Sequence, residues 1–421
     1  MTVMTSPPSI AFPQQNNGSQ RANSVGSGTF PGLDALRAWS AVAVVVLHSC
    51  VPYCQPSMPG LVWSVTDNPS QSVTILMWAI EVVIMPIFLV VAGFFAARSM
   101  ARSGAIPTLK NRCYRWGKIL TLAIVFLIPI ELYVWMLGWV ADGLITPRNV
   151  QTLKFKIAQA DHLWGFSHLW FLQYIITYVV VLWLGWEKLT RISPQAFKRL
   201  GLPICMTAAI VTLTCSPEVV WGFQHSFFPV FSKWIYSGLF FAAGAILWRC
   251  DPDLKSLSFR GERLLALSTL FWIASIVIGL WWLKQNTTLV TVRMTLAVLT
   301  VVPAVGVTFG LIGVSIRHIH ELGTITQRLA GASLLIYLLH HPVVGLSHIT
   351  AKYAFPNAPA SIKVLFVATL GVAAGLAVDF LWRSRAQRIR LANERVETQT
   401  ILFSHSKIDQ PSSAQEVKRA A

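Results

Sequence analysis

Residues 33–49 read LDALRAWSAVAVVVLHS, an apolar run that is interrupted by an arginine near its start and a histidine near its end. Apolar stretches of roughly 20 residues, enough to cross the hydrocarbon core of a bilayer, recur about ten times. Because backbone polar groups must be satisfied within lipid, each stretch is expected to be a helix. The sequence therefore predicts an all-α integral membrane protein, a bundle of about ten transmembrane helices, near residues 33–52, 72–97, 117–140, 169–187, 202–220, 234–249, 264–283, 290–313, 329–350 and 361–382.

The composition supports this class. Of the 421 residues, 54% are hydrophobic and 12% are charged. The charged fraction is half of the roughly one quarter that soluble domains carry. The net charge of +17 would suggest nucleic acid as a partner in a soluble protein. Here the basic residues lie in short clusters between apolar stretches, so we expect a lipid bilayer and no nucleic acid as partner.

The distribution of charge predicts the topology. Arg37 lies within the first stretch; of the other Lys and Arg residues, 25 fall on one side of the predicted helices and 8 on the other. Cytoplasmic loops carry the excess of Lys and Arg, so both termini are expected in the cytoplasm and the protein in the inner (plasma) membrane. Residues 1–30 are expected to form a disordered tail without a cleavable signal peptide, followed by a membrane domain at 31–385 and a polar tail at 386–421.

The first predicted helix carries two ionisable residues, which within a membrane are a functional hypothesis by default. Arg37 and His48 are eleven positions apart, so they share one helix face at about 16 Å separation. Asp34 precedes Arg37 by one turn and can pair with it. A functional role for Arg37 and snorkelling of its side chain to the membrane interface are equally good interpretations. The alternative to a functional role for His48 is packing inside the bundle.

The six cysteines show no metal-binding spacing, and no metal site is expected from the sequence. Cys50 and Cys54 lie near the end of the first helix. A disulfide between them and two separate thiols are both open, and the separate thiols are favoured because close neighbours on a helix rarely reach disulfide geometry.

Several segments resemble the membrane-bound acyltransferase-3 family. The first helix carries the Arg-x10-His pattern of that family, and four further segments follow in the family's order. The segment at 85–95 has Ala92 where the family usually has Ser. Two segments also resemble the subgroup that succinylates glucans, the glucans biosynthesis protein C-like proteins. The four further segments are MPIFLVVAGFF at 85–95, RCYR at 112–115, HLWFLQY at 168–174 and YLLHHP at 337–342.

The resemblance implies that an acetyl or succinyl group passes from cytoplasmic acyl-CoA, as co-substrate and not as a resident cofactor, to a hydroxyl of an extracytoplasmic or membrane-linked glycan. A hydroxyl that attacks a thioester needs a base, and neutral histidine suits neutral pH. His48 is the expected base. Arg112 and Arg115 are three positions apart, hence on one helix face, and are expected to bind the CoA phosphates on the cytoplasmic side, although an ordinary basic loop is the alternative.

Five other residues are candidates for the site. Glu81 is expected at a depth similar to that of His48, where it orients the imidazole, binds a sugar hydroxyl or joins two helices. His340 matches the histidine of the family's His-x-Pro, with core packing as its alternative, and Tyr337 lies one turn before it. His168 and Trp170 are expected to contact the acceptor, although Trp170 also suits an aromatic belt.

Two other functions remain open. A transporter or flippase of a lipid-linked glycan also needs many helices and ionisable residues within the membrane, but it predicts inverted repeats, and the sequence shows no convincing repeat. The second alternative is a structural membrane component without catalytic activity. It is less favoured because it does not explain why Arg37, His48 and Glu81 lie within membrane helices.

Overall fold

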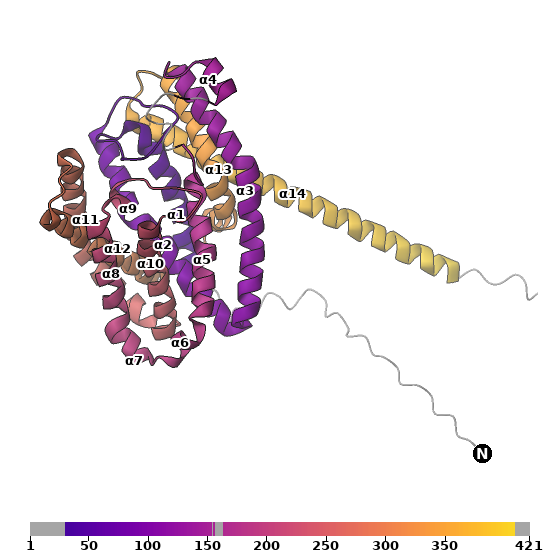
Figure 1. The fold of residues 1–421 in the computed structure, drawn as a ribbon. Helices are drawn as coiled ribbons and strands as arrows, with labels where there is room; N and C mark the ends of the chain where they lie inside the picture. The colour runs from indigo at the N-terminus through magenta and orange to yellow at the C-terminus, as the bar shows by residue number, and fades with distance from the viewer. Residues whose placement is uncertain (1–29, 154, 156–162, 409–421) are drawn as a thin grey trace, which may run out of the picture. The chain divides into compact units, whose positions relative to one another are not determined.

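The computed structural model describes residues 30–153, 155 and 163–408. The tail predicted at 1–30 thus lies outside the described residues except for Phe30. Over the described ranges every regular element is helical (Figure 1), which confirms the predicted all-α class. The elements are α1 Pro31–Cys50, η1 Val51–Tyr53, α2 Gln71–Ser103, α3 Ala105–Ala141, α4 Pro147–Thr152, η3 Ser167–Leu169, α5 Trp170–Leu184, α6 Trp186–Arg191, α7 Pro194–Ala196, η4 Phe197–Gly201, α8 Leu202–Cys215, α9 Glu218–Trp221, α10 Phe231–Cys250, α11 Lys255–Gln285, α12 Val290–His318, α13 Thr324–Ala354 and α14 Ala360–Ile408.

The helices agree with the predicted membrane spans in all but one case. In the described part of the chain, nine helical segments are long and apolar enough to cross a membrane. The tenth predicted stretch, 234–249, forms α10, whose 20 residues span about 30 Å. Its apolar character is diluted by polar residues, including the buried Lys233 and Ser237. Because α10 packs against α2, α5 and α8, much of it faces protein.

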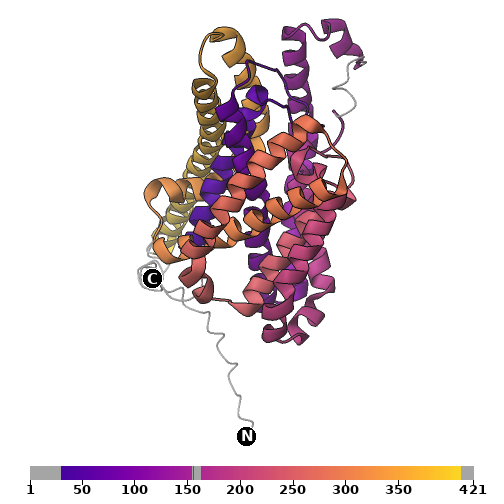
Figure 2. The ribbon, with the colours of Figure 1, turned by 90° about the vertical axis from the view of Figure 1, so that its left-hand side faces the viewer.

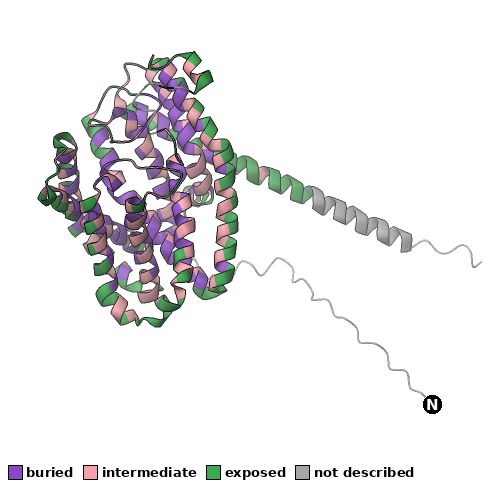
Figure 3. Cartoon of the chain, viewed as in Figure 1, coloured by how far each residue is buried: buried purple, intermediate pink, exposed green. Residues whose placement is uncertain are grey.

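Apolar side chains also cover the outside of the bundle. On α11, Leu267 and Leu270 are 68% and 73% exposed, and α3 exposes Phe126 and Leu122 in the same way. Figure 3 shows these helices with long exposed faces, whereas α1 and α2 are largely buried. An exposed apolar surface of this extent suits contact with lipid.

Helix α1 occupies the middle of the bundle. It contacts α2, α12, α13 and α14, and Figure 2 shows α13 and α14 running beside it. Small residues allow these approaches: a Cβ on Gly32 would lie 2.4 Å from the carbonyl oxygen of Ser315 on α12. The residues that α1 carries therefore face protein on several sides.

The predicted basic loop between the second and third helices does not exist. Helix α2 continues to Ser103 and α3 begins at Ala105, so Gly104 alone separates them, with φ of 86°, a conformation that favours glycine. Arg112 and Arg115 both lie on helix α3, as their spacing predicts. The prediction of a loop failed because basic residues are good helix formers and do not end a helix by themselves.

At the other end of the chain, the last helix is longer than its apolar stretch. The sequence predicts a span at 361–382 and a polar tail from 386, whereas α14 continues as one helix to Ile408. The polar residues of this region are thus helical as far as the structure describes them.

We predict that the contact between α2 and α10 depends on two glycines. A Cβ on Gly244 would lie 2.0 Å from the carbonyl oxygen of Val90, and one on Gly93 equally close to that of Phe241. Gly244→Ala should therefore force the helices apart and lower the free energy of unfolding of the detergent-solubilised protein by about 1–3 kcal/mol. Gly117→Ala on α3 is the matched control, since a Cβ there meets nothing within 4 Å. Equal losses in both variants would contradict the prediction.

Candidate functional site

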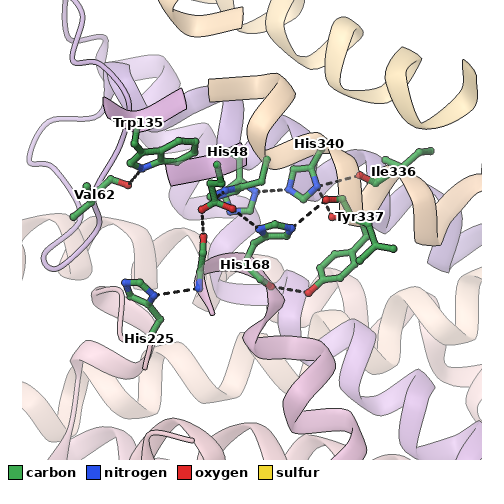
Figure 4. A network of polar contacts seen from close by, with 12 residues as sticks. His48, Val62, Trp135, His168, His225, Ile336, Tyr337 and His340 are labelled. Carbon is green, nitrogen blue, oxygen red and sulfur yellow. Dashed lines mark hydrogen bonds and ion pairs between the residues drawn. The ribbon is translucent and has the colours of Figure 1, made fainter. Parts of the chain in front are cut away.

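A proline in α13 prepares one wall of the site. Pro342 lacks an N–H, so the carbonyl of Leu338, four residues earlier, has no helical donor. Nε2 of His168 lies 3.3 Å from that carbonyl oxygen, and the hydroxyl of Tyr337 donates to the backbone oxygen of His168 at 2.6 Å. Two hydrogen bonds thus join η3 to α13, and Figure 4 shows them side by side.

His48 on α1 is held by His340 on α13. Nδ1 of His340 lies 2.7 Å from the carbonyl oxygen of Tyr337 and 3.1 Å from that of Ile336. Carbonyl oxygens only accept, so this Nδ1 carries the proton and Nε2 of neutral His340 is an acceptor. Nε2 of His340 is 3.0 Å from Nδ1 of His48, which must therefore donate. The network assigns the lone pair of neutral His48 to its Nε2.

A buried carboxylate lies beside the imidazole rings of His168 and His341. Glu131 on α3 is 7% exposed, and its Oε2 and Oε1 lie 3.2 Å and 3.0 Å from Nδ1 of His168 and of His341. The hydroxyl of Ser167 donates to Oε1. The imidazoles of His168 and His341 stack at 4.5 Å between ring centroids. Side chains from α3, η3 and α13 thus meet at one point.

Indole rings close the site on the side of residues 54–70. The ring of Trp63 lies parallel to that of His48, with centroids 5.8 Å apart, and Trp135 stacks on His341. Trp63 donates through Nε1 to Nδ1 of His348, whose Nε2 then donates to the carbonyl oxygen of Ser49. Trp135 and Trp139 donate to the backbone oxygens of Val62 and Trp63. These bonds hold the irregular segment against the imidazoles.

A cavity of about 90 Å³ reaches this cluster. Glu131, Ser167 and His341 form its polar wall, and its other walls combine aliphatic and aromatic side chains. His225 also lines the cavity, where its Nδ1 accepts from the backbone N–H of Ser167 at 3.2 Å. The aromatic residues of the lining are Trp135, Trp164, Phe223 and Phe227.

The structure brings together four of the residues that the sequence singled out: His48, His340, His168 and Tyr337. The sequence predicts that His168 contacts the acceptor; in the structure its side chain is 2% exposed and both ring nitrogens face protein atoms.

Glu81 and Trp170 belong to a neighbouring cluster. Glu81 interacts electrostatically with Lys233 on α10. Nζ of Lys233 lies 3.8 Å from the ring centroid of Trp170 and donates to the backbone oxygen of Gln224 at 2.9 Å. The ring of His48 has His340, His341 and Trp63 as its neighbours instead.

The arginines lie towards the other end of α1. Arg37 pairs with Asp34 at 3.2 Å, as its position one turn later predicts. Nη2 of Arg112 donates to the backbone oxygen of Phe95 and the hydroxyl of Ser99, both at 3.0 Å, so Arg112 joins α3 to α2. Arg115 is exposed.

The two cysteines near the end of α1 are free thiols, as the sequence favoured. Cys54 donates to the backbone oxygen of Cys50 at 3.3 Å, and burial raises the pKa of Cys54 to about 12.

The sequence patterns do not single out Glu131, and they indicate His340 without its neighbour His341. Glu131 stands in the apolar stretch LIPIELYVW, so the rule that selected Glu81 also applied to it. Trp63 gave no signal, because its role depends on where an irregular segment folds back.

Over the ranges that the structure describes, nine apolar helices with a buried polar cluster define a multi-pass membrane protein. A family model described as an acyltransferase domain matches residues 30–378. The match covers most of the chain, so the protein belongs to the acyltransferase-3 family and is an acyltransferase. Neither a comparison with curated proteins nor one with solved structures found a match.

We predict that His348 keeps residues 54–70 in place. His348→Ala removes the acceptor of the Trp63 indole and the donor to Ser49, so the segment should open more often. The maleimide labelling rate of Cys54, followed by mass spectrometry of its peptide, should rise by about tenfold or more, because the thiol becomes solvated and ionises more readily.

His318→Ala serves as the control for this measurement, since His318 is exposed and pairs with Glu262 elsewhere. A Cys54 labelling rate that stays at the wild-type value in His348→Ala would show that the segment is held by other contacts.

Proposed function

We propose that the protein transfers an acetyl or succinyl group from cytoplasmic acyl-CoA to a hydroxyl of an extracytoplasmic or membrane-linked glycan, with His48 as general base. The observation that carries the proposal is the hydrogen bond between His48 and the buried His340. It supports a neutral His48 whose Nε2 is free to take a proton, as a positioned base requires.

The chemistry follows from this tautomer. Nε2 of His48 takes the proton of the acceptor hydroxyl while its oxygen attacks the thioester carbonyl. The tetrahedral intermediate then breaks its carbon–sulfur bond, and the imidazolium of His48 returns the proton to the CoA sulfur. The products are an ester and free CoA, and the base is regenerated.

One neighbour favours the charged form of His48 that occurs during the reaction, because the parallel ring of Trp63 offers a π face to an imidazolium. His340 acts as a positioning residue, because it fixes which nitrogen of His48 is free.

The acceptor is proposed to enter from the end of the bundle that contains residues 54–70. The cavity of about 90 Å³ lies at this end and reaches His341. The aromatic residues of its lining suit the apolar C–H faces of sugar rings, and its polar wall suits hydroxyl groups. The distribution of Lys and Arg supports an extracytoplasmic location for this end in the plasma membrane.

The donor is proposed to approach from the opposite end, where Arg37, Arg112 and Arg115 lie. Arg37 and His48 share one face of α1 at about 16 Å separation, a distance that the extended pantetheine arm of CoA can span. Arg115 is exposed and available for phosphate, whereas Arg112 already binds α2. We therefore assign phosphate binding mainly to Arg115, with Arg112 holding the helix beside it.

We predict that His48→Gln abolishes transfer. Glutamine keeps hydrogen-bonding capacity but has no basic nitrogen, so the rate should fall by about 100- to 10,000-fold. The measurement is the appearance of label from radioactive acetyl-CoA or succinyl-CoA in envelope glycans, with purified protein in liposomes. Near-normal turnover in His48→Gln would remove this residue from catalysis, and glycan transport without acyl labelling in the wild type would indicate a transporter.

The donor site gives a separate prediction. Arg115→Ala should raise the apparent KM for acyl-CoA by about tenfold with little change in kcat, because one charge-assisted contact to phosphate is lost. The change should shrink at high salt. Arg148→Ala is the matched control, since Arg148 is an exposed arginine beyond the far end of α3. An unchanged KM in Arg115→Ala would place the phosphates elsewhere.

A further inference from the structure

Three buried side chains near His48 bring their ligand atoms close together. The carboxylate of Glu131 and one ring nitrogen each of His168 and His341 all lie within 4.8 Å of one another. The three residues are 7%, 4% and 3% exposed. Two imidazoles and one carboxylate form a donor set that zinc uses in proteins.

The hydrogen bonds around His168 place two acceptors opposite each other in this cluster. Nε2 of His168 faces the carbonyl oxygen of Leu338, which only accepts, so Nε2 carries a proton. In the neutral ring, Nδ1 then has a lone pair, and it faces Oε2 of Glu131 at 3.2 Å. Two acceptors at this distance repel unless a proton, on the ring or on the carboxyl group, or a metal ion lies between them.

The directions of the atoms favour a metal over a proton. Among the described residues, Nδ1 of His168, Nδ1 of His341 and Oε2 of Glu131 have no hydrogen bond of acceptable geometry, although the nitrogens lie 3.2 Å and 3.0 Å from the carboxylate oxygens. A ring N–H would therefore point past its oxygen. Tetrahedral bonds of about 2.0–2.1 Å place the ligands of zinc about 3.3 Å apart, close to both separations.

The surroundings also resemble the support that metal ligands need. The carbonyl oxygen of Leu338 holds the second nitrogen of His168, and the hydroxyl of Ser167 donates to Glu131. The polar wall of the cavity of about 90 Å³ includes Glu131 and His341, so a water or a substrate oxygen can complete the coordination.

We propose that Glu131, His168 and His341 bind one divalent transition-metal ion, with zinc the best match to the ligand types. The site is separate from the proposed base, since His48 is no ligand, but it lies one imidazole away from it. Metal binding does not depend on which acyl group or acceptor the protein uses.

The test is the metal content of the full chain, purified in detergent without a histidine tag and dialysed against zinc and then against metal-free buffer. Inductively coupled plasma mass spectrometry should find about one zinc per chain, and Glu131→Gln and His168→Gln should each lower the content by about tenfold or more. His318→Ala should retain the zinc, because the exposed pair of His318 and Glu262 lies outside the cluster.

A second measurement needs no variant. Cobalt added to the metal-free wild type should give the intense visible absorption of a four-coordinate site, and zinc should displace it. Less than about a tenth of a zinc per chain in the wild type, equal zinc in wild type and Glu131→Gln, or only the weak absorption of octahedral cobalt would overturn the proposal. Neither measurement uses acyl-CoA, so failure here is distinct from failure of the proposed acyl transfer.

Discussion

The carboxylate of Glu131 is the constraint on which the arrangement of the site depends. A carboxylate within an apolar membrane helix is costly unless donors or cations surround it. The hydroxyl of Ser167 on η3 donates to Glu131, and the Nδ1 atoms of His168 on η3 and His341 on α13 lie 3.2 Å and 3.0 Å from its oxygens. Because these partners belong to elements far apart in sequence, satisfying one carboxylate fixes how α3 and the start of α5 pack against α13.

The same requirement explains why irregular backbone is found beside the site. Residues 54–70 form no long helix, and their polar groups must be satisfied by protein or water. Indole N–H groups of Trp135 and Trp139 bond two of their carbonyl oxygens, and Ser64 donates to the backbone oxygen of Gly345. Gly138 permits the close approach, because a Cβ there would lie 2.0 Å from the carbonyl oxygen of Ser64. The segment is therefore anchored by helices that also carry the site.

A feature of the fold or of the candidate site could be predicted where it depends on residues that are close together in the sequence. The helices follow from apolar runs, and the shared face of Arg37 and His48 follows from helical periodicity. The partner of an ionisable residue is set by tertiary packing, so the sequence selected Glu81 and missed Glu131, although both obey the same rule. The loop expected around Arg112 failed for a related reason. Charge indicates which residues avoid lipid, but it does not say where a helix ends.

His340 and His341 contact different partners because of helix geometry. Adjacent residues of an α-helix point about 100° apart, so two neighbouring histidines can serve different partners. His340 faces α1 and fixes the tautomer of His48, while His341 faces α3 and meets Glu131. Pro342, next in the chain, frees the carbonyl that holds His168. Three consecutive residues of α13 thus connect the candidate base to a buried charge, and moving their register by one position would break both contacts at once.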